Sequence, residues 1–309
     1  MSYAKVLGVH GRQDGYLEGN GYLISWCVGH LVELAPPSAY DEKYVRWNVA
    51  DLPILPQEWQ YLVSASTKKQ FSVLKKLMHR ADVDTVVNSC DAGREGELIF
   101  RLVYEQAGCK KPVSRLWLSS MEDSAVREGF VNLKPSTEYD ALYQAALCRE
   151  RADWMVGINC SRLFSCLYGR PLAVGRVMTP TLAMTVEREA AIAAFVPEKF
   201  YTVALELTSG FVASSRRISE KPAAEKLLAE CRKEMVSTIQ KITRKEKAEN
   251  PPSLYDLTTL QRDANRLLGY SAQQTLIYVQ SLYEKKLTTY PRTDSCYITD
   301  DDEDMLEEL

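Results

Sequence analysis

The sequence predicts an α/β domain built on a parallel sheet, followed by mainly helical and then small mixed α+β segments. The first observation is a βαβ pattern, with apolar strand candidates at residues 85–90 and 113–118, each followed by helical spacing. The second is continuous helical spacing over residues 138–168. The third is alternation in residues 201–207, a Ser-Gly turn and a second short strand, which predict a hairpin.

The remaining elements are predicted from the same two periodicities. The other strand candidates are residues 22–28 and 236–242. The clearest boundary is Asn250-Pro251-Pro252, because consecutive prolines interrupt both helix and sheet. The other predicted helices cover residues 4–8, 67–80, 123–130, 221–233, 257–268 and 272–285, a stretch before that hairpin to about 194, and a start at Thr299.

Composition excludes several classes of protein. A hydrophobic content of 46% with 26% charged residues is typical of a globular protein, and no apolar run reaches the ~18 residues of a membrane span. We expect a cytoplasmic protein, since no targeting segment is evident. The eight cysteines include no C-x-x-C pair, which argues against a zinc site or a disulfide framework. The net charge is −3, but seven acids lie in the last ten residues, so the rest is mildly basic.

Tyr290 is the strongest candidate for a chemical role. It lies where an extended segment meets Pro291, and Arg292 follows two positions later, so phenol and guanidinium can face the same anion. A phosphate would suit both groups. From these residues alone, a strand-end tyrosine before an Asp/Ser turn is the better explanation of the pattern.

Asp91 and Glu95 lie four residues apart where the first predicted strand passes into a helix. Ligands of parallel sheets bind at the carboxyl ends of strands, and two carboxylates there can hold Mg²⁺. Arg94 between them is a candidate for phosphate binding. The alternative is a helix start that favours acids because of its dipole. Of the three histidines, only His30 lies in a loop that suggests a function.

Two further stretches could contact a nucleic acid. Residues 175–181 place a glycine, an arginine and two hydroxyls at a helix start, where free N–H groups attract phosphate. Trp154 and Arg162 lie within about 80° of each other on one helix, which suits a stacked base beside a phosphate. The simpler interpretations are a capped helix start and a buried tryptophan.

Four motifs together resemble the type IA DNA topoisomerases, and most closely bacterial topoisomerase III of plasmids and conjugative elements. They occur in the order and roughly the spacing of that family, and the resemblance covers essentially the whole chain. The motifs are DAGREGELI (91–99), GRVMTPTLA (175–183), LYDLTTLQ (254–261) and TYPRTDS (289–295).

The resemblance implies a role for each candidate residue. Tyr290 would be the nucleophile that forms a 5′-phosphotyrosine, and Arg292 would stabilise the charge on that phosphate. Asp91 and Glu95 match the toprim acids that bind Mg²⁺. The positions that match DNA contacts are Trp47, Arg94, Trp154, Arg162, Ala173, Val174, Gly175, Arg176, Val177, Met178 and Arg292.

The resemblance also implies a domain layout and a cofactor requirement. We expect a toprim domain at residues 1–135, part of a helical domain binding single-stranded DNA at 136–199, part of the arch at 200–250 and a tyrosine domain at 251–309. The partner would be single-stranded or negatively supercoiled DNA, bound by a monomer. Since a phosphotyrosine conserves the bond energy, no nucleotide cofactor is implied.

The sequence departs from the family pattern at several points. Gly93 stands where the middle toprim acid is usual, Met178 where a glutamine is usual and Cys296 where an arginine is common. The match begins after the family's first strand, whose Glu-Lys-Pro-Ser glutamate has no counterpart here, and ends within the tyrosine domain. We therefore expect a chain truncated at both ends, with impaired activity.

Three functions are consistent with these observations. The first is ATP-independent, magnesium-dependent cleavage, strand passage and religation of DNA. The second is a remnant that binds single-stranded DNA without catalysis. The third is another toprim enzyme, such as a primase or nuclease, which would have no use for the tyrosine motif at 289–295.

Overall fold

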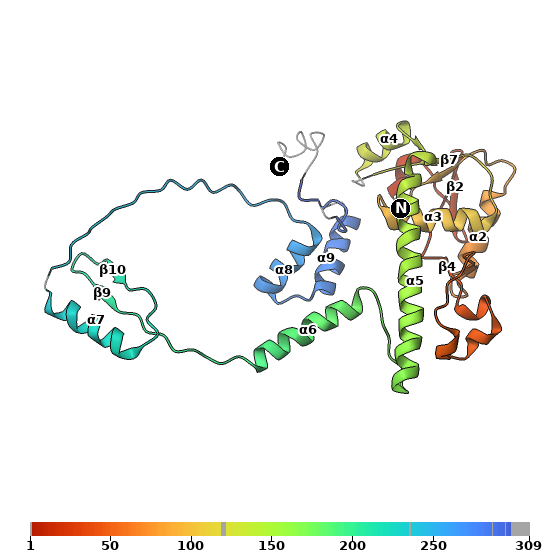
Figure 1. Cartoon of the computed structure of the whole chain (residues 1–309). Helices are drawn as coiled ribbons and strands as arrows, with labels where there is room; N and C mark the ends of the chain where they lie inside the picture. Colours follow the sequence, from red (N-terminus) through yellow and green to blue (C-terminus); the bar gives the residue numbers. More distant parts are fainter. Residues whose placement is uncertain (1, 119–121, 235, 286, 294, 298–309) are drawn as a thin grey trace. The chain divides into compact units, whose positions relative to one another are not determined.

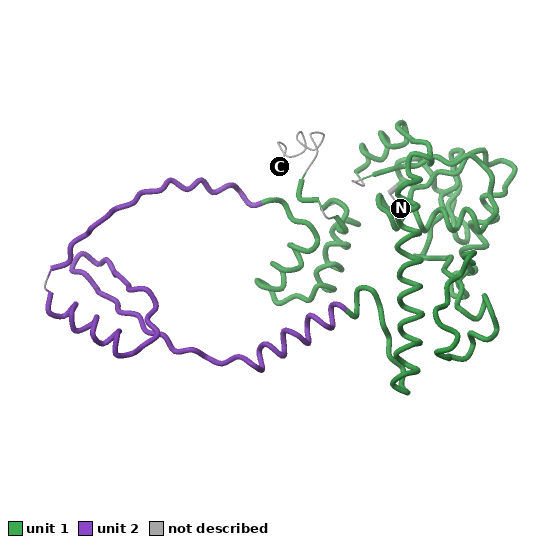
Figure 2. Tube along the Cα trace, viewed as in Figure 1, with its two compact units in different colours: residues 1–179, 253–309 green, residues 180–252 purple. Residues whose placement is uncertain are grey.

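The structure, a computed structural model, describes residues 2–118, 122–234, 236–285, 287–293 and 295–297. Figure 1 shows its helices and strands. The chain divides into two compact units, residues 1–179 with 253–309 and residues 180–252, which Figure 2 colours green and purple. The helix predicted to begin at Thr299 lies outside the described residues.

The larger unit begins with one helix and two small antiparallel sheets. The loop between β2 and β3 has positive φ at both Asn20 (50°) and Gly21 (78°), as a type I′ hairpin turn requires. The first sheet has the order β1-β2-β3 and the second pairs β4 with β5. Their bounds are α1 (Ser2–Leu7), β1 (Gly11–Gln13), β2 (Tyr16–Gly19), β3 (Tyr22–Ser25), β4 (Val32–Leu34) and β5 (Tyr61–Val63), with 3₁₀ turns η1 (Pro37–Ala39), η2 (Glu42–Val45) and η3 (Val49–Asp51) between β4 and β5.

The predicted βαβ unit is confirmed. β6 and β7 are parallel, with Asn88 opposite Arg115, and α3 forms the crossover between them. β8 pairs antiparallel with β7. The elements are β6 (Val86–Asn88), α3 (Arg94–Ala107), β7 (Val113–Arg115), α4 (Asp123–Val131) and β8 (Lys134–Pro135). The fold class is therefore mixed α/β with a parallel strand pair, as the sequence predicted.

The hydrophobic core of this unit lies where α2 (Lys68–Met78), α3 and α5 (Asp140–Tyr168) meet the strand β4. Each helix contributes an apolar stripe at helical spacing, such as Leu98 and Leu102 of α3. The buried members are Leu31, Val32, Phe71, Leu74, Met78, Leu98, Leu102, Val103, Ala107, Cys109, Tyr143, Ala146 and Leu147. This core fixes α3, and with it the turn that precedes α3.

The helix predicted at 138–168 is confirmed as η4 (Ser136–Tyr139) followed by α5. Its 29 residues extend about 43 Å at 1.5 Å per residue. It ends at Gly169, whose φ of 63° is left-handed, a conformation that glycine adopts without strain. α5 therefore joins the core, through its first turns, to residues far from it.

The helices α8 (Leu257–Leu268) and α9 (Ala272–Glu284) are confirmed and precede the tyrosine motif. Each begins with a capping box, in which Asp256 accepts from the backbone N–H of Thr259 and Ser271 accepts from that of Gln274. These caps fix where each helix starts, and α9 ends six residues before Tyr290.

The smaller unit contains most of α6 (Met178–Ala193), the predicted hairpin and one further helix. β9 (Ala204–Glu206) and β10 (Val212–Ser214) are antiparallel, and α7 (Lys221–Lys233) matches the predicted helix. The strand predicted at 236–242 is wrong: the described residues of this range form no strand, and Val236, Ile239 and Ile242 are exposed. Alternation alone is insufficient, because a strand also needs a partner edge for its backbone groups.

Membrane-spanning helices are absent from the described part of the chain: none combines the length and the apolar character that a span requires.

Candidate functional site

The phenol of Tyr290 donates a hydrogen bond to Oδ2 of Asp91 at 2.9 Å, although the two residues lie 199 positions apart. Asp91 follows β6 and Tyr290 follows α9, so two separate motifs of the sequence meet at this contact. Tyr290 is partly buried, while Asp91 is exposed. The larger unit therefore brings a potential nucleophile and a carboxylate together in a position that solvent reaches.

The turn that presents Asp91 is compact and contains two glycines, of which only Gly96 is required by close packing. The N–H of Gly93 donates to the carbonyl of Asp91 at 2.8 Å, and the N–H of Glu97 donates to the carbonyl of Gly93 at 3.1 Å. A Cβ at position 96 would lie 2.2 Å from the carbonyl oxygen of Asp91, so only glycine permits this approach. At position 93, by contrast, a Cβ would meet nothing within 4 Å.

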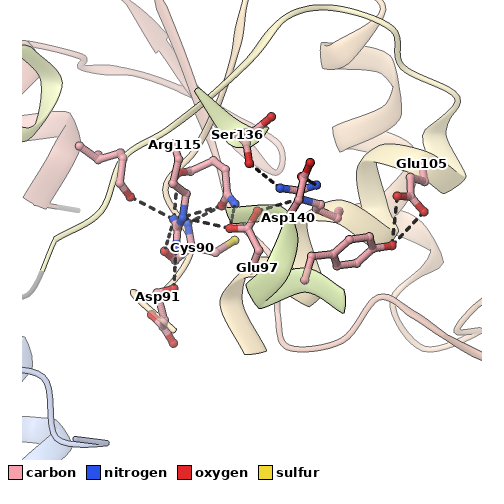
Figure 3. Close-up of polar contacts among 11 residues, drawn as sticks. Cys90, Asp91, Glu97, Glu105, Arg115, Ser136 and Asp140 are labelled. Carbon is pink, nitrogen blue, oxygen red and sulfur yellow. Dashed lines mark hydrogen bonds and ion pairs between the residues drawn. The ribbon is translucent and has the colours of Figure 1, made fainter. Parts of the chain in front are cut away.

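Arg115 at the end of β7 fixes the backbone on which Asp91 stands, as Figure 3 shows. Its Nη2 donates to the carbonyl of Asp91 and its Nη1 to that of Cys90, both at 2.7 Å. Its Nε forms an ion pair of 3.1 Å with Glu97, and both side chains are fully buried. Charge-assisted bonds to backbone carbonyls leave the turn little freedom.

The buried charge of Glu97 is balanced by the ion pair with Arg115 and by two hydrogen-bond donors. Besides Arg115, Asn88 donates to its Oε2 at 2.9 Å and Arg101 donates to its Oε1 at 2.8 Å. Arg101 reaches further, to Asp140 at 2.5 Å and to the carbonyl of Ser136 at 2.6 Å. The network thus ties the Asp91 turn to α3 and to the start of α5 (Figure 3).

The electrostatic surroundings keep the Tyr290 phenol protonated at neutral pH. Burial is the largest cause that raises its pKa, to about 12, and the negative charge of Asp91 with its hydrogen bond adds to this. The positive charge of Arg292 acts in the opposite direction and lowers the pKa. The ring also packs edge-on against Tyr283, with centroids 5.6 Å apart.

Glu95, the second predicted metal ligand, lies one helical turn beyond Asp91. Its carboxylate is 3.8 Å from Nε2 of His30 and 3.9 Å from Nε of Arg94, and its side chain is 56% exposed. No group of three or more His, Cys, Asp or Glu side chains that could hold a metal is found among the described residues. Two exposed carboxylates are a donor set that suits Mg²⁺, which keeps several waters and takes one or two protein carboxylates.

Trp47, Trp154 and Arg162 lie around α5 and the turns between β4 and β5. The guanidinium of Arg162 lies 5.4 Å from the ring centroid of Trp47, which is half exposed. Trp154 donates from Nε1 to the carbonyl of Ala35 at 3.1 Å and packs edge-on against Trp59. Trp154 is therefore engaged in packing, whereas Trp47 offers an exposed ring supported by a cation.

The segment Ala173–Met178 runs beside α5. Val174 donates from its N–H to Oγ of Ser161 at 2.9 Å, and Gly175 donates to Oγ1 of Thr179 at 3.0 Å. Arg176 is paired with Asp153 of α5, and this pairing lowers the pKa of that carboxyl. The structure thus holds this arginine on the helix surface through an exposed ion pair.

Arg115, Glu97 and Arg101 are the residues that sequence reasoning missed. The signal was an arginine inside a predicted buried strand, Val113-Ser114-Arg115-Leu116. A charge in such a position is rarely fully buried unless it is paired. A search for its partner among the acids of the preceding helix would have identified Glu97.

Comparisons with known proteins agree on one family. A family model described as DNA topoisomerase matches residues 137–309. DNA topoisomerase 3 of Shouchella clausii is 45% identical over 99% of this chain and 43% of its own length. The DNA topoisomerase 3 proteins of Bacillus cereus and Bacillus subtilis are each 43% identical over 96% of this chain and 42% of their length.

Among solved structures, full-length topoisomerase I from Thermotoga maritima shares the fold, with a TM-score of 0.68 at 23% identity. The match covers 100% of this chain and 50% of that one. The chain spans less than half the length of the curated relatives it matches. On the family match, the relatives and the fold together, the chain belongs to the type IA DNA topoisomerase family.

Proposed function

We propose that this protein acts as a DNA topoisomerase 3, which cleaves one DNA strand through Tyr290, passes a second strand and rejoins the break without ATP. The observation that carries the proposal is the hydrogen bond between Tyr290 and Asp91 at 2.9 Å. The chain is 45% identical to DNA topoisomerase 3 of Shouchella clausii over 43% of that protein's length, which supports the same activity.

In the proposed reaction the Tyr290 oxygen attacks the phosphorus of a phosphodiester. An O–P bond forms to the tyrosine, the bond from phosphorus to the 3′-oxygen breaks, and that oxygen takes up a proton. The phenol proton leaves towards Asp91, which already accepts its hydrogen bond. Religation is the reverse: the 3′-hydroxyl attacks the phosphotyrosine and the phenol is restored, so no external energy is required.

Arg292 would stabilise the charge that develops on the attacked phosphate. Its positive charge already lowers the pKa of Tyr290, against the opposing effects of burial and Asp91. A phenol with a pKa near 12 is a poor nucleophile at pH 7, so the proton has to be removed during the attack.

Asp91 and Glu95 are the residues that would hold Mg²⁺, and their exposed oxygens suit it. When bound, the ion would neutralise negative charge on the DNA phosphate. Since Oδ2 of Asp91 accepts from the phenol, Oδ1 would take the ligand role. Arg115 contributes by fixing the backbone of Asp91, whichever role that carboxylate performs.

The proposed DNA contacts are the exposed Trp47 on Arg162, together with Arg94, Trp154, Arg292 and residues 173–178. We assign residues 1–135 to a toprim domain, 136–199 to a helical domain for single-stranded DNA, 200–250 to an arch and 251–309 to the tyrosine domain. The substrate would be single-stranded or negatively supercoiled DNA, bound by a cytoplasmic monomer without a nucleotide cofactor.

Covalent trapping tests this function directly. With a single-stranded oligonucleotide labelled at its 3′ end and Mg²⁺ present, we expect denaturing gels to show label attached to the protein. The adduct should disappear in Tyr290→Phe and persist in the matched control Tyr297→Phe, an exposed phenol seven residues away. An adduct that survives Tyr290→Phe would refute the assignment of the nucleophile.

A second candidate is a module that binds single-stranded DNA without cleaving it, favoured by the exposed Trp47 ring on Arg162. It is the conclusion to draw if the wild-type chain forms no adduct but binds the oligonucleotide. Such binding should weaken with salt, survive Tyr290→Phe and decrease in Arg162→Ala.

A further inference from the structure

An aromatic pair lies just beyond the end of β7, close to the candidate site. The rings of Trp117 and Tyr139 are stacked, with centroids 5.1 Å apart and planes inclined by 17°. Trp117 is 40% exposed, whereas Tyr139 is partly buried at the end of η4. The pair therefore presents a supported indole to solvent.

The topology places this pair at the same sheet edge as Asp91. β6 and β7 are parallel and Asn88 is opposite Arg115, so Asp91 and Trp117 follow their strands at the carboxyl ends. Ligands of parallel sheets bind outside this edge.

Arg115 connects the two features physically. Its Nη2 donates to the carbonyl of Asp91 at 2.7 Å, and its Cζ lies 5.0 Å from the ring centroid of Trp117. With a C–N bond of about 1.3 Å, the indole centroid is within about 9 Å of that carbonyl. The guanidinium is also 5.9 Å from the Tyr139 ring. One buried cation thus holds both the Asp91 backbone and the aromatic pair.

The chemistry of this surface suits a nucleobase. Every base has an aromatic face, and exposed aromatic side chains stack on bases without regard to sequence. A packing role alone would favour burial of the indole, since its large apolar area gains free energy when it leaves water. The separation from Asp91 fits a nucleotide adjacent to the one whose phosphate reaches Tyr290.

We propose that Trp117, supported by Tyr139 and Arg115, is a stacking platform for one unpaired base of single-stranded DNA beside the cleavage position. This rests on the proposed function of the same site. The platform selects an unpaired strand over a duplex, since a paired base has both faces covered by its neighbours.

Binding measurements in EDTA test the platform without cleavage. The anisotropy of a fluorescent single-stranded 12-mer gives Kd for the wild type, Trp117→Leu, Trp117→Phe and Trp26→Leu. Trp26 is a matched control, because it is 46% exposed and the described residues give it no ring or cation contact. We expect Trp117→Leu to raise Kd by about 5- to 150-fold, the range for loss of one base–aromatic stack.

Trp117→Phe, which keeps a ring, should recover most of the affinity, and Trp26→Leu should stay within about twofold of wild type. A set of oligonucleotides with one abasic position each locates the stacked base. Removal of the base at one position should weaken binding by the wild type and should not weaken binding by Trp117→Leu any further. The duplex should bind wild type and Trp117→Leu equally.

The proposal is overturned if the Kd of Trp117→Leu for the single strand stays within twofold of wild type, or if the variant weakens binding of duplex and single strand equally. It is also overturned if every abasic position weakens binding by Trp117→Leu as much as it weakens binding by the wild type. A wild-type chain without measurable single-strand binding overturns it as well. The covalent-trapping experiment has a separate readout, so a failure of Tyr290 chemistry and a failure of the platform are distinguishable.

Discussion

Asp91 and Tyr290 meet in one hydrogen bond, yet the two sides of that bond are held differently. The backbone of Asp91 is tied to the fully buried Arg115, which is itself paired with Glu97. The tyrosine segment, residues 287–293, is partly exposed. Among the described residues its backbone contacts to the rest of the unit are those of Thr293, whose carbonyl accepts from Leu257 at 3.3 Å, and Leu287, which donates to the carbonyl of Leu282 at 2.9 Å.

If the proposed cleavage separates Tyr290 from Asp91, the difference indicates which of the two moves. Breaking the Asp91 side would expose buried charges, whereas the tyrosine segment can move at the cost of a few exposed contacts. A reaction that separates the ends of a cut strand requires one side to move and the other to keep its geometry. The structure favours the tyrosine side as the moving one.

Arg115→Ala should have the largest effect on the fixed side. It leaves the carboxylate of Glu97 buried with reduced compensation, so we expect the free energy of unfolding to fall by ~3–5 kcal/mol. Urea denaturation followed by tryptophan fluorescence measures this, because all five tryptophans lie in the larger unit. The control Arg176→Ala removes an exposed ion pair that solvent screens, so it should lower the free energy of unfolding far less than Arg115→Ala. Equal effects of the two variants would contradict the comparison.

Removal of a helix cap should have an intermediate effect on the free energy of unfolding. It tests the attachment of the tyrosine segment. Asp256→Ala and Ser271→Ala each lose an N-cap, and each should lower the free energy of unfolding less than Arg115→Ala. The side chain of Asp256 also accepts from Sγ of Cys296 at 3.9 Å, beyond the tyrosine. We therefore expect faster hydrogen exchange in residues 287–293 for Asp256→Ala only. The same acceleration in Ser271→Ala would show that the cap does not anchor the segment.

The smallest expected effect is on the pH dependence of stability. Burial raises the pKa of Tyr61 in β5 from 10.0 to about 12. A folded-state pKa above the unfolded one contributes stability that is complete below pH 10 and is lost as the pH rises through 12. Tyr61→Phe should flatten this alkaline loss in urea titrations between pH 9 and about 12.

Tyr290, whose pKa is also raised to about 12, provides the contrast. We expect its segment to detach before the core unfolds, so Tyr290→Phe should leave the alkaline slope of global unfolding nearly unchanged. A flattening as large as that of Tyr61→Phe would mean that the two sides unfold as one unit.

The sequence predicted most of the fold because the relevant signals are local. The helices at 221–233 and 257–268 carry their own periodicity and stops, and their bounds match the structure. The strand at 236–242 failed because its partner edge is not a local property. At the site, the acidic and tyrosine motifs were visible in the sequence, but the role of Arg115 depends on which strands are neighbours.

The two glycines after Asp91 have different evolutionary consequences. Position 96 is closed to every other residue, because a Cβ there would collide with the Asp91 carbonyl. Position 93 has an extended φ of −178° and open space around its Cβ, so an aspartate fits without moving the backbone. A glycine codon can become an aspartate codon by a single base change. Space therefore excludes side chains at position 96 but admits an aspartate at position 93 while Asp91 stays in place.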